Sequence, residues 1–180
     1  MKILKIIITF GVLASMFFMT GCDQFENFSV TVPLTITFNE STQNSTINRV
    51  ESYDLDNNSV YNEYKDRIEN FEFVEARYVV TEIDPADLTG DIVLTVRRDD
   101  EDGHVLFTAE RTFDPETDLN TSYDFVLTAE EISFFNSYLM ATGGSKVFWG
   151  EADITNIEGS SETKEVTVKV HLLLKAKGTL

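Results

Sequence analysis

The sequence predicts an all-β protein with two short helices, folded as an antiparallel β-sandwich of about eight strands. Apolar and polar residues alternate with a period of two over most of residues 28–177, which is the spacing of strands with one buried face. Turn residues separate these runs. The two segments with helical spacing interrupt groups of strands and do not follow each strand, which argues against a parallel βαβ fold. A closed, lipocalin-like β-barrel is the alternative arrangement of the same strands.

The first strand is predicted at residues 28–38, where every second residue is apolar. Pro33 lies in its middle and has no N–H to donate to a neighbouring strand, so we expect this strand at a sheet edge. A weaker strand follows at residues 47–55. A helix is then predicted to begin at Ser59 and to continue to residue 71. The side chains that it is expected to bury are Tyr61, Tyr64 and Ile68.

Four further strands are predicted at residues 71–83, 91–98, 104–113 and 122–127. Their inward-facing residues are expected to be Val74, Ala76, Tyr78, Val80, Ile92, Leu94, Val96, Val105, Phe107, Ala109, Phe113, Tyr123, Phe125 and Leu127. Between the second and third of these strands, Asp102-Gly103 predicts a two-residue hairpin, because both residues tolerate positive φ. Asp-Pro dipeptides at 84–85 and 114–115 predict turns on either side of that hairpin.

The second helix is predicted at residues 128–141. Thr128 as N-cap and Glu131 three residues later form a capping box, and Gly143-Gly144 end the helix. A strand at 146–156 and a final strand at 165–177 complete the fold. The final strand has the clearest pattern, because six alternate apolar residues face one way and Thr167, Lys169, His171 and Lys175 face the other. Those six are Val166, Val168, Val170, Leu172, Leu174 and Ala176.

The first 22 residues form a separate unit. Lys2 and Lys5 precede an apolar stretch of 13 residues, Ile6 to Phe18. A membrane span needs about 20 apolar residues, so this stretch has the length of a signal-peptide core. Met19, Thr20, Gly21 and Cys22 follow, and this segment resembles the lipobox of bacterial lipoproteins.

That resemblance implies a lipid on Cys22, the only cysteine, and cleavage immediately before it. We therefore divide the chain into a signal peptide (1–21), a lipidated tether (22–27) and one β-sandwich domain (28–180). An Asp after the cysteine, as Asp23 is here, goes with inner-membrane retention in proteobacterial lipoproteins. Acidic residues near the anchor go with surface export in Bacteroidetes-like organisms, and both locations stay open.

The charge of the mature chain restricts its partners. Removal of residues 1–21 leaves 159 residues with 12 Lys and Arg against 31 Asp and Glu, a formal charge of −19. Nucleic-acid binding depends on clustered Lys and Arg, and the sequence has no such cluster, so we expect no nucleic-acid partner. The expected partners are the membrane, through the lipid on Cys22, and an envelope protein or glycan.

No enzyme motif stands out. The only histidines, His104 and His171, are not near a plausible serine nucleophile in the sequence, and there is no G-x-S-x-G, H-E-x-x-H or phosphate-binding loop. A pair of carboxylates would suffice for a hydrolase, but no particular pair stands out. We therefore predict a non-enzymatic envelope protein that acts by binding or structural assembly. A carrier of lipid or another hydrophobic ligand, and a carboxylate-dependent envelope hydrolase, are the alternatives.

Two groups of residues are candidate sites. We expect no cofactor other than a calcium ion, for which the two Asp-Pro turns would supply oxygen ligands. The residues of this calcium hypothesis are Asp84, Asp87, Asp91, Asp114, Glu116 and Asp118. The second candidate is Trp149, the only tryptophan, which the alternation puts on the outer face of its strand. It would contact a glycan or a partner protein there, unless helix 128–141 folds over that face and buries it.

Overall fold

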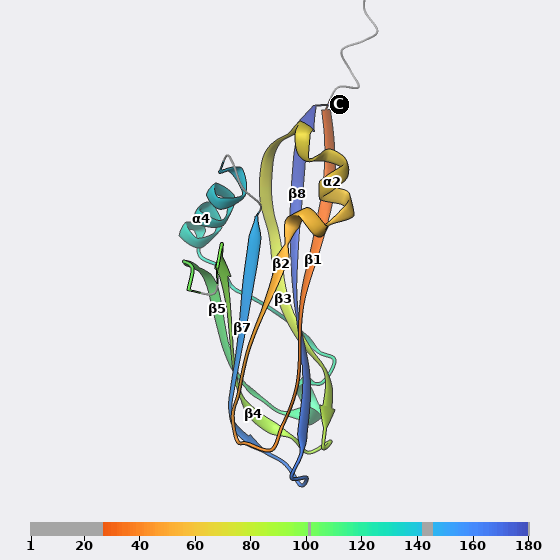
Figure 1. Cartoon of the computed structure of the whole chain (residues 1–180), viewed down its shortest axis with the longest axis vertical. Helices are drawn as coiled ribbons and strands as arrows, with labels where there is room; N and C mark the ends of the chain where they lie inside the picture. Colours follow the sequence, from red (N-terminus) through yellow and green to blue (C-terminus); the bar gives the residue numbers. More distant parts are fainter. Residues whose placement is uncertain (1–26, 101, 142–145, 180) are drawn as a thin grey trace, which may run out of the picture.

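The computed structural model describes residues 27–100, 102–141 and 146–179. These residues form two four-stranded antiparallel sheets that pack face to face in an elongated sandwich (Figure 1). The predicted signal peptide (1–21), Cys22 and all of the tether except Asn27 lie outside the described residues, so the structure does not test them.

The first sheet has the strand order β1-β8-β3-β6, and the second has the order β2-β7-β4-β5. The strands of the first sheet are β1 (Asn27–Thr42), β8 (Lys164–Thr179), β3 (Ile68–Asp84) and β6 (Ser122–Asp124). Those of the second are β2 (Ile47–Asp54), β7 (Val147–Glu158), β4 (Thr89–Arg98) and β5 (Val105–Phe113).

The pairing has a simple rule. β1 pairs with β8, β2 with β7, β3 with β6 and β4 with β5, as in one long hairpin rolled into two layers. This is the topology of a jelly roll. It confirms the predicted antiparallel sandwich of eight strands. The described strands do not close into one continuous barrel, so the lipocalin-like alternative is wrong.

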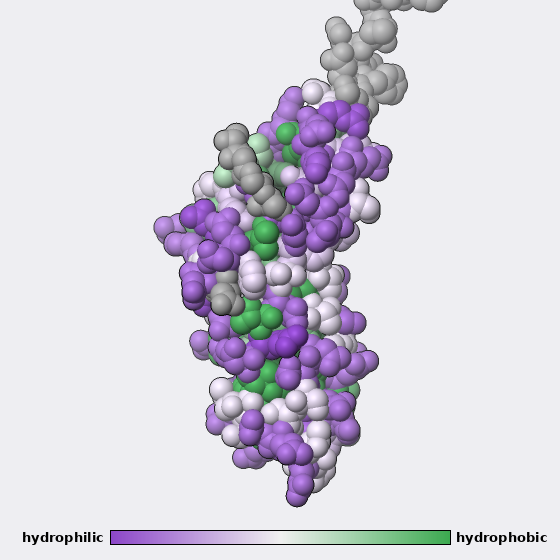
Figure 2. Space-filling view, in the orientation of Figure 1, coloured by the Kyte–Doolittle hydropathy of each residue, from purple (hydrophilic) through white to green (hydrophobic). Residues whose placement is uncertain are grey.

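The core lies between the sheets and follows the predicted alternation most closely in β8. All six of its predicted inward residues are at most 5% exposed. They oppose the alternate apolar residues of β1 on one side and those of β3 on the other. Pro33 stands in an edge strand, as expected. On the face seen in Figure 2 most of the surface is hydrophilic, and the hydrophobic residues form small separate patches.

Two predicted inward residues point outward because β-bulges break the period of two. Val74 is 47% exposed, and it is the extra residue of β3 between the positions that pair with Leu174 and Leu173. Val105 is 38% exposed, because a similar shift in β5 buries Leu106 and Phe107 next to each other. One extra residue reverses the face of every side chain beyond it. The sequence alone does not reveal such an insertion.

The first helix begins where predicted but is much shorter. α2 (Ser59–Tyr64) lies between two short 3₁₀ turns, η1 (Leu55–Asn57) and η2 (Lys65–Arg67). The side chain of Asn58 caps α2 by accepting from the Tyr61 N–H, and it donates to the Pro33 carbonyl across 2.7 Å. The predicted continuation to residue 71 is wrong, because Ile68 already begins β3 and pairs with β8. Strand pairing here outweighs the helical pattern.

The helix α4 (Ala129–Met140) has the predicted capping box between Thr128 and Glu131. It lies along the edge of β3 and replaces a neighbouring strand there. The Asn136 side chain accepts from the Phe73 N–H across 2.8 Å, and the Met140 sulfur accepts from the Phe71 N–H across 3.2 Å. α4 therefore covers an edge that would otherwise be open to another chain.

Two other local predictions need correction. The predicted strand at 122–127 is only β6, after which the chain turns away to reach α4 and leaves Val126 95% exposed. β4 and β5 form the predicted hairpin, but residues 99–104 connect them, and Asp102-Gly103 is not a two-residue turn. Asp99 takes the positive φ of 71° in this connection. The short helix α3 (Pro115–Asp118) occupies the second Asp-Pro turn.

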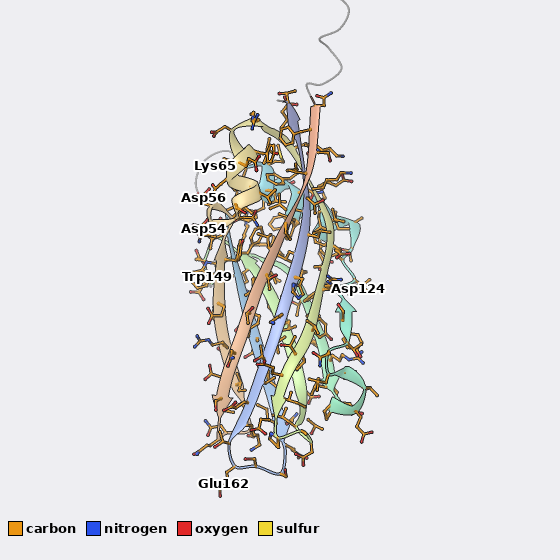
Figure 3. The ribbon with its side chains drawn as sticks, turned by 90° about the vertical axis from the view of Figure 1, so that its right-hand side faces the viewer. Asp54, Asp56, Lys65, Asp124, Trp149 and Glu162 are labelled. Atoms are coloured by element: carbon orange, nitrogen blue, oxygen red, sulfur yellow. The ribbon has the colours of Figure 1, made fainter. Side chains whose placement is uncertain are left out.

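The connections divide between the two ends of the sandwich (Figure 1). We call the end with Asn27 and Thr179 the proximal end; α2, the β4–β5 connection and α4 lie toward it. At the opposite, distal end lie the connections 43–46, 85–88, 114–121 and 159–163. Glu162, labelled in Figure 3, marks the distal end.

Val170→Asp tests the assignment of the core. Val170 is 1% exposed and opposes Ile36 and Tyr78, so the substitution buries a charge without a partner. We expect the free energy of unfolding, measured in urea, to fall by about 4 kcal/mol or more. The matched control is Thr37→Asp on the outer face of the neighbouring strand, opposite Lys169, which should change stability by less than about 0.5 kcal/mol. Equal stability of the two variants would contradict the core assignment.

Candidate functional site

The six residues of the calcium hypothesis occupy two connections and their flanking strands toward the distal end. Asp84 ends β3, Asp87 lies in the connection to β4, and Asp91 lies in β4 itself. Asp114, Glu116 and Asp118 belong to the connection around α3. Both connections cross from one sheet to the other. The prediction that they fall at the same end is therefore confirmed, although the path is not a meander within one sheet.

The carboxylates of the first connection hold the backbone and neighbouring strands together. Asp87 accepts from the backbone N–H of Ser160 across 3.1 Å and from its hydroxyl across 3.0 Å. Asp91 accepts from the Thr112 hydroxyl across 2.6 Å and from the Asn156 amide across 2.7 Å. These hydrogen bonds lower the pKa of both carboxyl groups. Both carboxylates thus have protein partners where the calcium hypothesis needs metal ligands.

Asp118 is the most engaged of the six. Its carboxylate is 2% exposed and forms an ion pair with Arg111, whose Nη2 lies 2.9 Å from Oδ1. It also accepts from the Tyr123 hydroxyl, the Thr117 hydroxyl and the Asp114 backbone N–H. The Arg111 guanidinium in turn lies 3.8 Å above the centre of the Tyr123 ring. This network connects β5, α3 and β6 across the two sheets.

The network decides the ionisation state of Asp118. Burial alone would raise the pKa of this carboxyl group, but the hydrogen bonds from Arg111, Tyr123, Asp114 and Thr117 outweigh burial and hold the pKa well below its usual value. The guanidinium stands where a bound cation would have to stand. Across the ranges that the structure describes, no group of three or more His, Cys, Asp or Glu residues is placed to hold a metal ion. The calcium hypothesis therefore has no geometric support and stays a prediction.

Trp149 lies on the outer face of the second sheet, as the alternation predicts. Its neighbours in the sequence, Phe148 and Gly150, are buried, whereas Trp149 is partly exposed. The alternative, in which helix 128–141 covers this face, is wrong because α4 packs against β3 and β5, and its Phe135 inserts between the sheets. In Figure 3, Trp149 and Asp124 of β6 lie on opposite sides of the sandwich.

Three neighbours surround Trp149 on this face. Ser52 of β2 and Arg97 of β4 lie directly opposite it on the two adjacent strands, and Glu151 lies two residues along β7. We call Ser52, Arg97, Trp149 and Glu151 the Trp149 face. Arg97 and Glu151 form an ion pair of 3.0 Å, with 27% and 24% of their side chains exposed. The buried Nε of Arg97 has no hydrogen-bond partner.

The β4–β5 connection fixes the indole ring. Asp99 donates its backbone N–H to the Val147 carbonyl across 3.0 Å, and its own carbonyl accepts from the Trp149 Nε1 across 3.1 Å. The Tyr138 hydroxyl of α4 donates to the same Val147 carbonyl across 2.8 Å. Burial, followed by the charge of Asp99, raises the pKa of Tyr138 to about 12, so this hydroxyl keeps its proton. The ring of Trp149 is thus held by the fold.

The sequence analysis identified Trp149 but missed Arg97, Glu151 and Ser52. These residues lie far apart in the chain and meet only through the register of β2, β7 and β4. Their alternation within each strand is a signal that they point outward, but nothing in one sequence gives the register between strands. The analysis also missed Arg111 and Tyr123, which partner Asp118.

The interior of the sandwich is filled at the site that a carrier would need to keep open. Phe107, Phe135 and Phe148 are each at most 2% exposed. The centre of the Phe135 ring lies 5.5 Å from that of Phe148 and 5.2 Å from that of Phe73. Large aromatic side chains here pack on one another and do not line a cavity. The carrier hypothesis gains no support from this arrangement.

The two histidines lie apart from each other and from the Trp149 face. His104 stacks against Phe134 with ring centres 4.4 Å apart. His171, on the outer face of the first sheet, lies 3.0 Å from the Thr35 hydroxyl. Burial and the neighbouring charges of Arg77 and Lys169 lower the pKa of His171. Neither arrangement adds support for the hydrolase alternative.

Comparisons with known proteins extend only to the fold. No protein-family model matches the sequence, and no curated protein matches it significantly. Among solved structures the chain resembles that of Desmodium yellow mottle tymovirus, with 10% identity and a TM-score of 0.44 over 86% of this chain and 83% of that one. It also resembles turnip yellow mosaic virus (8% identity, TM-score 0.43, 85% and 94% coverage) and BFDV capsid protein (13%, 0.42, 87% and 96%). Likenesses of this size support no inference about function.

Asp118→Asn tests the network around α3. The variant keeps the shape of the side chain but removes the charge that Arg111, Tyr123 and Asp114 contact. We expect the free energy of unfolding at pH 7 to fall by about 2–3 kcal/mol, because Arg111 loses its partner and the buried donors lose acceptors. Glu116→Gln, which changes an exposed carboxylate in the same helix, should change it by less than about 0.5 kcal/mol.

The same pair of proteins tests the pH dependence. Because the pKa of Asp118 is lower in the folded state than in the unfolded chain, its contribution is complete above its unfolded pKa of about 3.9. That contribution is lost as the pH falls further. The stability difference between wild type and Asp118→Asn should therefore narrow below about pH 4. A constant difference from pH 7 to pH 3 would show that Asp118 does not titrate as this network requires.

Proposed function

We propose that this protein is a lipid-anchored component of a bacterial cell envelope, whose β-sandwich binds a partner and does not catalyse a reaction. The observation that carries this proposal is the order of features at the start of the chain: Lys2 and Lys5, then 13 apolar residues, then small residues before Cys22. Two or more acyl chains on Cys22 would hold the protein stably at a membrane, whereas one alone would be marginal.

The arrangement of the sandwich is compatible with such an anchor. β1 begins at Asn27, five residues after Cys22, at the proximal end of an elongated domain. Five residues reach roughly 15–20 Å when extended. The proximal end would then face the membrane, and the four distal connections would point away from it. Within the described residues, no helix is both long enough and apolar enough to cross a membrane.

A binding role is favoured by the Trp149 face. It presents a partly exposed indole, a cation and a carboxylate on a rigid sheet, and buried or half-buried aromatic and Arg side chains dominate binding energies at interfaces. Binding by rigid elements also loses little conformational entropy. This face lies on the side of the sandwich, so an anchor at the proximal end would leave it free to meet a partner in the envelope.

Cys22→Ala tests the anchor. The full chain and the variant are expressed in a bacterium, and membrane and soluble fractions are separated. We expect wild type in the membrane fraction, with an N-terminal peptide that begins at Cys22 and carries acyl chains by mass spectrometry, and a variant without lipid. Thr20→Ser, which keeps a small residue before the cysteine, serves as the control and should be lipidated. An unmodified Cys22 in the wild-type protein would contradict the proposal.

A further inference from the structure

We propose that the Trp149 face binds the neutral pyranose ring of a glycan. This inference rests on the proposed binding role of the domain but not on the lipid anchor. The face combines what a sugar ring needs from a protein: a flat apolar platform, a hydrogen-bond donor and an acceptor beside it. Each of these features comes from a different strand or a different position along β7.

The first step is the orientation of the indole. Its only polar atom, Nε1, already donates to the Asp99 carbonyl, so the remaining exposed part of Trp149 is its apolar π surface. One face of a pyranose ring presents C–H groups, which are attracted to the negative face of an aromatic ring. A partner that sought a hydrogen bond from Trp149 would find that donor occupied. The structure therefore favours stacking over polar recognition at this residue.

The second step is the polar pair beside the ring. Arg97 lies directly opposite Trp149, and the ion pair with Glu151 restrains both side chains. Glu151 also accepts from the Asn48 amide across 3.3 Å. A sugar hydroxyl both donates and accepts, so neighbouring hydroxyls match a guanidinium next to a carboxylate. Because the pair is already ordered, little side-chain entropy is lost when a ligand binds.

The third step is charge, which selects against ionic ligands. The Arg97 guanidinium beside the indole repels a cation from the ring surface that would otherwise attract it. The formal charge of −17 on the whole chain disfavours the approach of an anionic ligand. Within the Trp149 face itself, the charges of Arg97 and Glu151 cancel. A neutral polyol is the ligand class that meets neither obstacle.

The test uses the full chain, purified in a detergent without a sugar headgroup. The probes are hexamers of β-1,4-linked glucose, β-1,4-linked N-acetylglucosamine and α-1,4-linked glucose. Saturation-transfer NMR and the fluorescence of Trp149, the only tryptophan, report contact with the ring. We expect saturable binding of at least one hexamer, with a dissociation constant on the order of 1 mM, as suits one stacked ring with a few hydrogen bonds.

Variants locate the binding. Trp149→Ala should weaken the NMR-detected affinity at least 10-fold, and Arg97→Ala should weaken it about threefold. Arg49→Ala, which removes an exposed arginine elsewhere on the same sheet, should leave it unchanged. Circular dichroism and thermal unfolding confirm that each variant is folded. Retained affinity in Trp149→Ala would overturn the assignment of the site.

Two further outcomes separate this inference from the proposed function. No saturable binding of any of the three hexamers up to about 10 mM, or preferential binding of hexalysine or of a uronic-acid hexamer, would overturn the neutral-sugar inference. Neither result would affect the lipid on Cys22. Conversely, sugar binding by a chain whose Cys22 carries no lipid would refute the anchoring proposal and leave this inference standing.

Discussion

The position of Phe135 between the two sheets is the constraint on which the proximal half of the molecule depends. The side chain is fully buried, and its ring contacts Phe73 of the first sheet and both Phe107 and Phe148 of the second. Two sheets that pack face to face need side chains from both to fill the space between them. Near the proximal end, one residue of a helix does part of this work. α4 is therefore part of the core and not an addition to the surface.

Several features follow from that position. With Phe135 inserted, α4 lies against β3, where Asn136 and Met140 take the hydrogen bonds that another strand would take. The same placement brings Tyr138 to the carbonyl of Val147, which Asp99 also contacts. Asp99 then holds the indole of Trp149. A contact in the core is in this way connected, by three hydrogen bonds, to the candidate binding surface on the outside of the sandwich.

The sequence predicted the sandwich well because alternation is a local property that survives in every strand. β8 shows this, since each of its six inward residues is buried. Prediction failed where the outcome depends on pairing between distant segments: the bulges at Val74 and Val105, and the end of α2 at Tyr64. The same reason explains the candidate site. Trp149 was visible as an outward aromatic residue, but Arg97 and Ser52 join it only through strand register. The acidic turns were predicted as metal ligands from composition, whereas the structure pairs Asp118 with Arg111.

The central claim is that Trp149 is a held but accessible residue on the outer face of the second sheet. Acrylamide quenching of the native protein tests it most directly, since all tryptophan emission comes from this residue. The account predicts emission between that of a buried indole and that of the urea-unfolded chain, with quenching that is clearly measurable in the native state. Emission typical of a buried indole, unquenched by acrylamide, would contradict it and remove Trp149 as a binding residue.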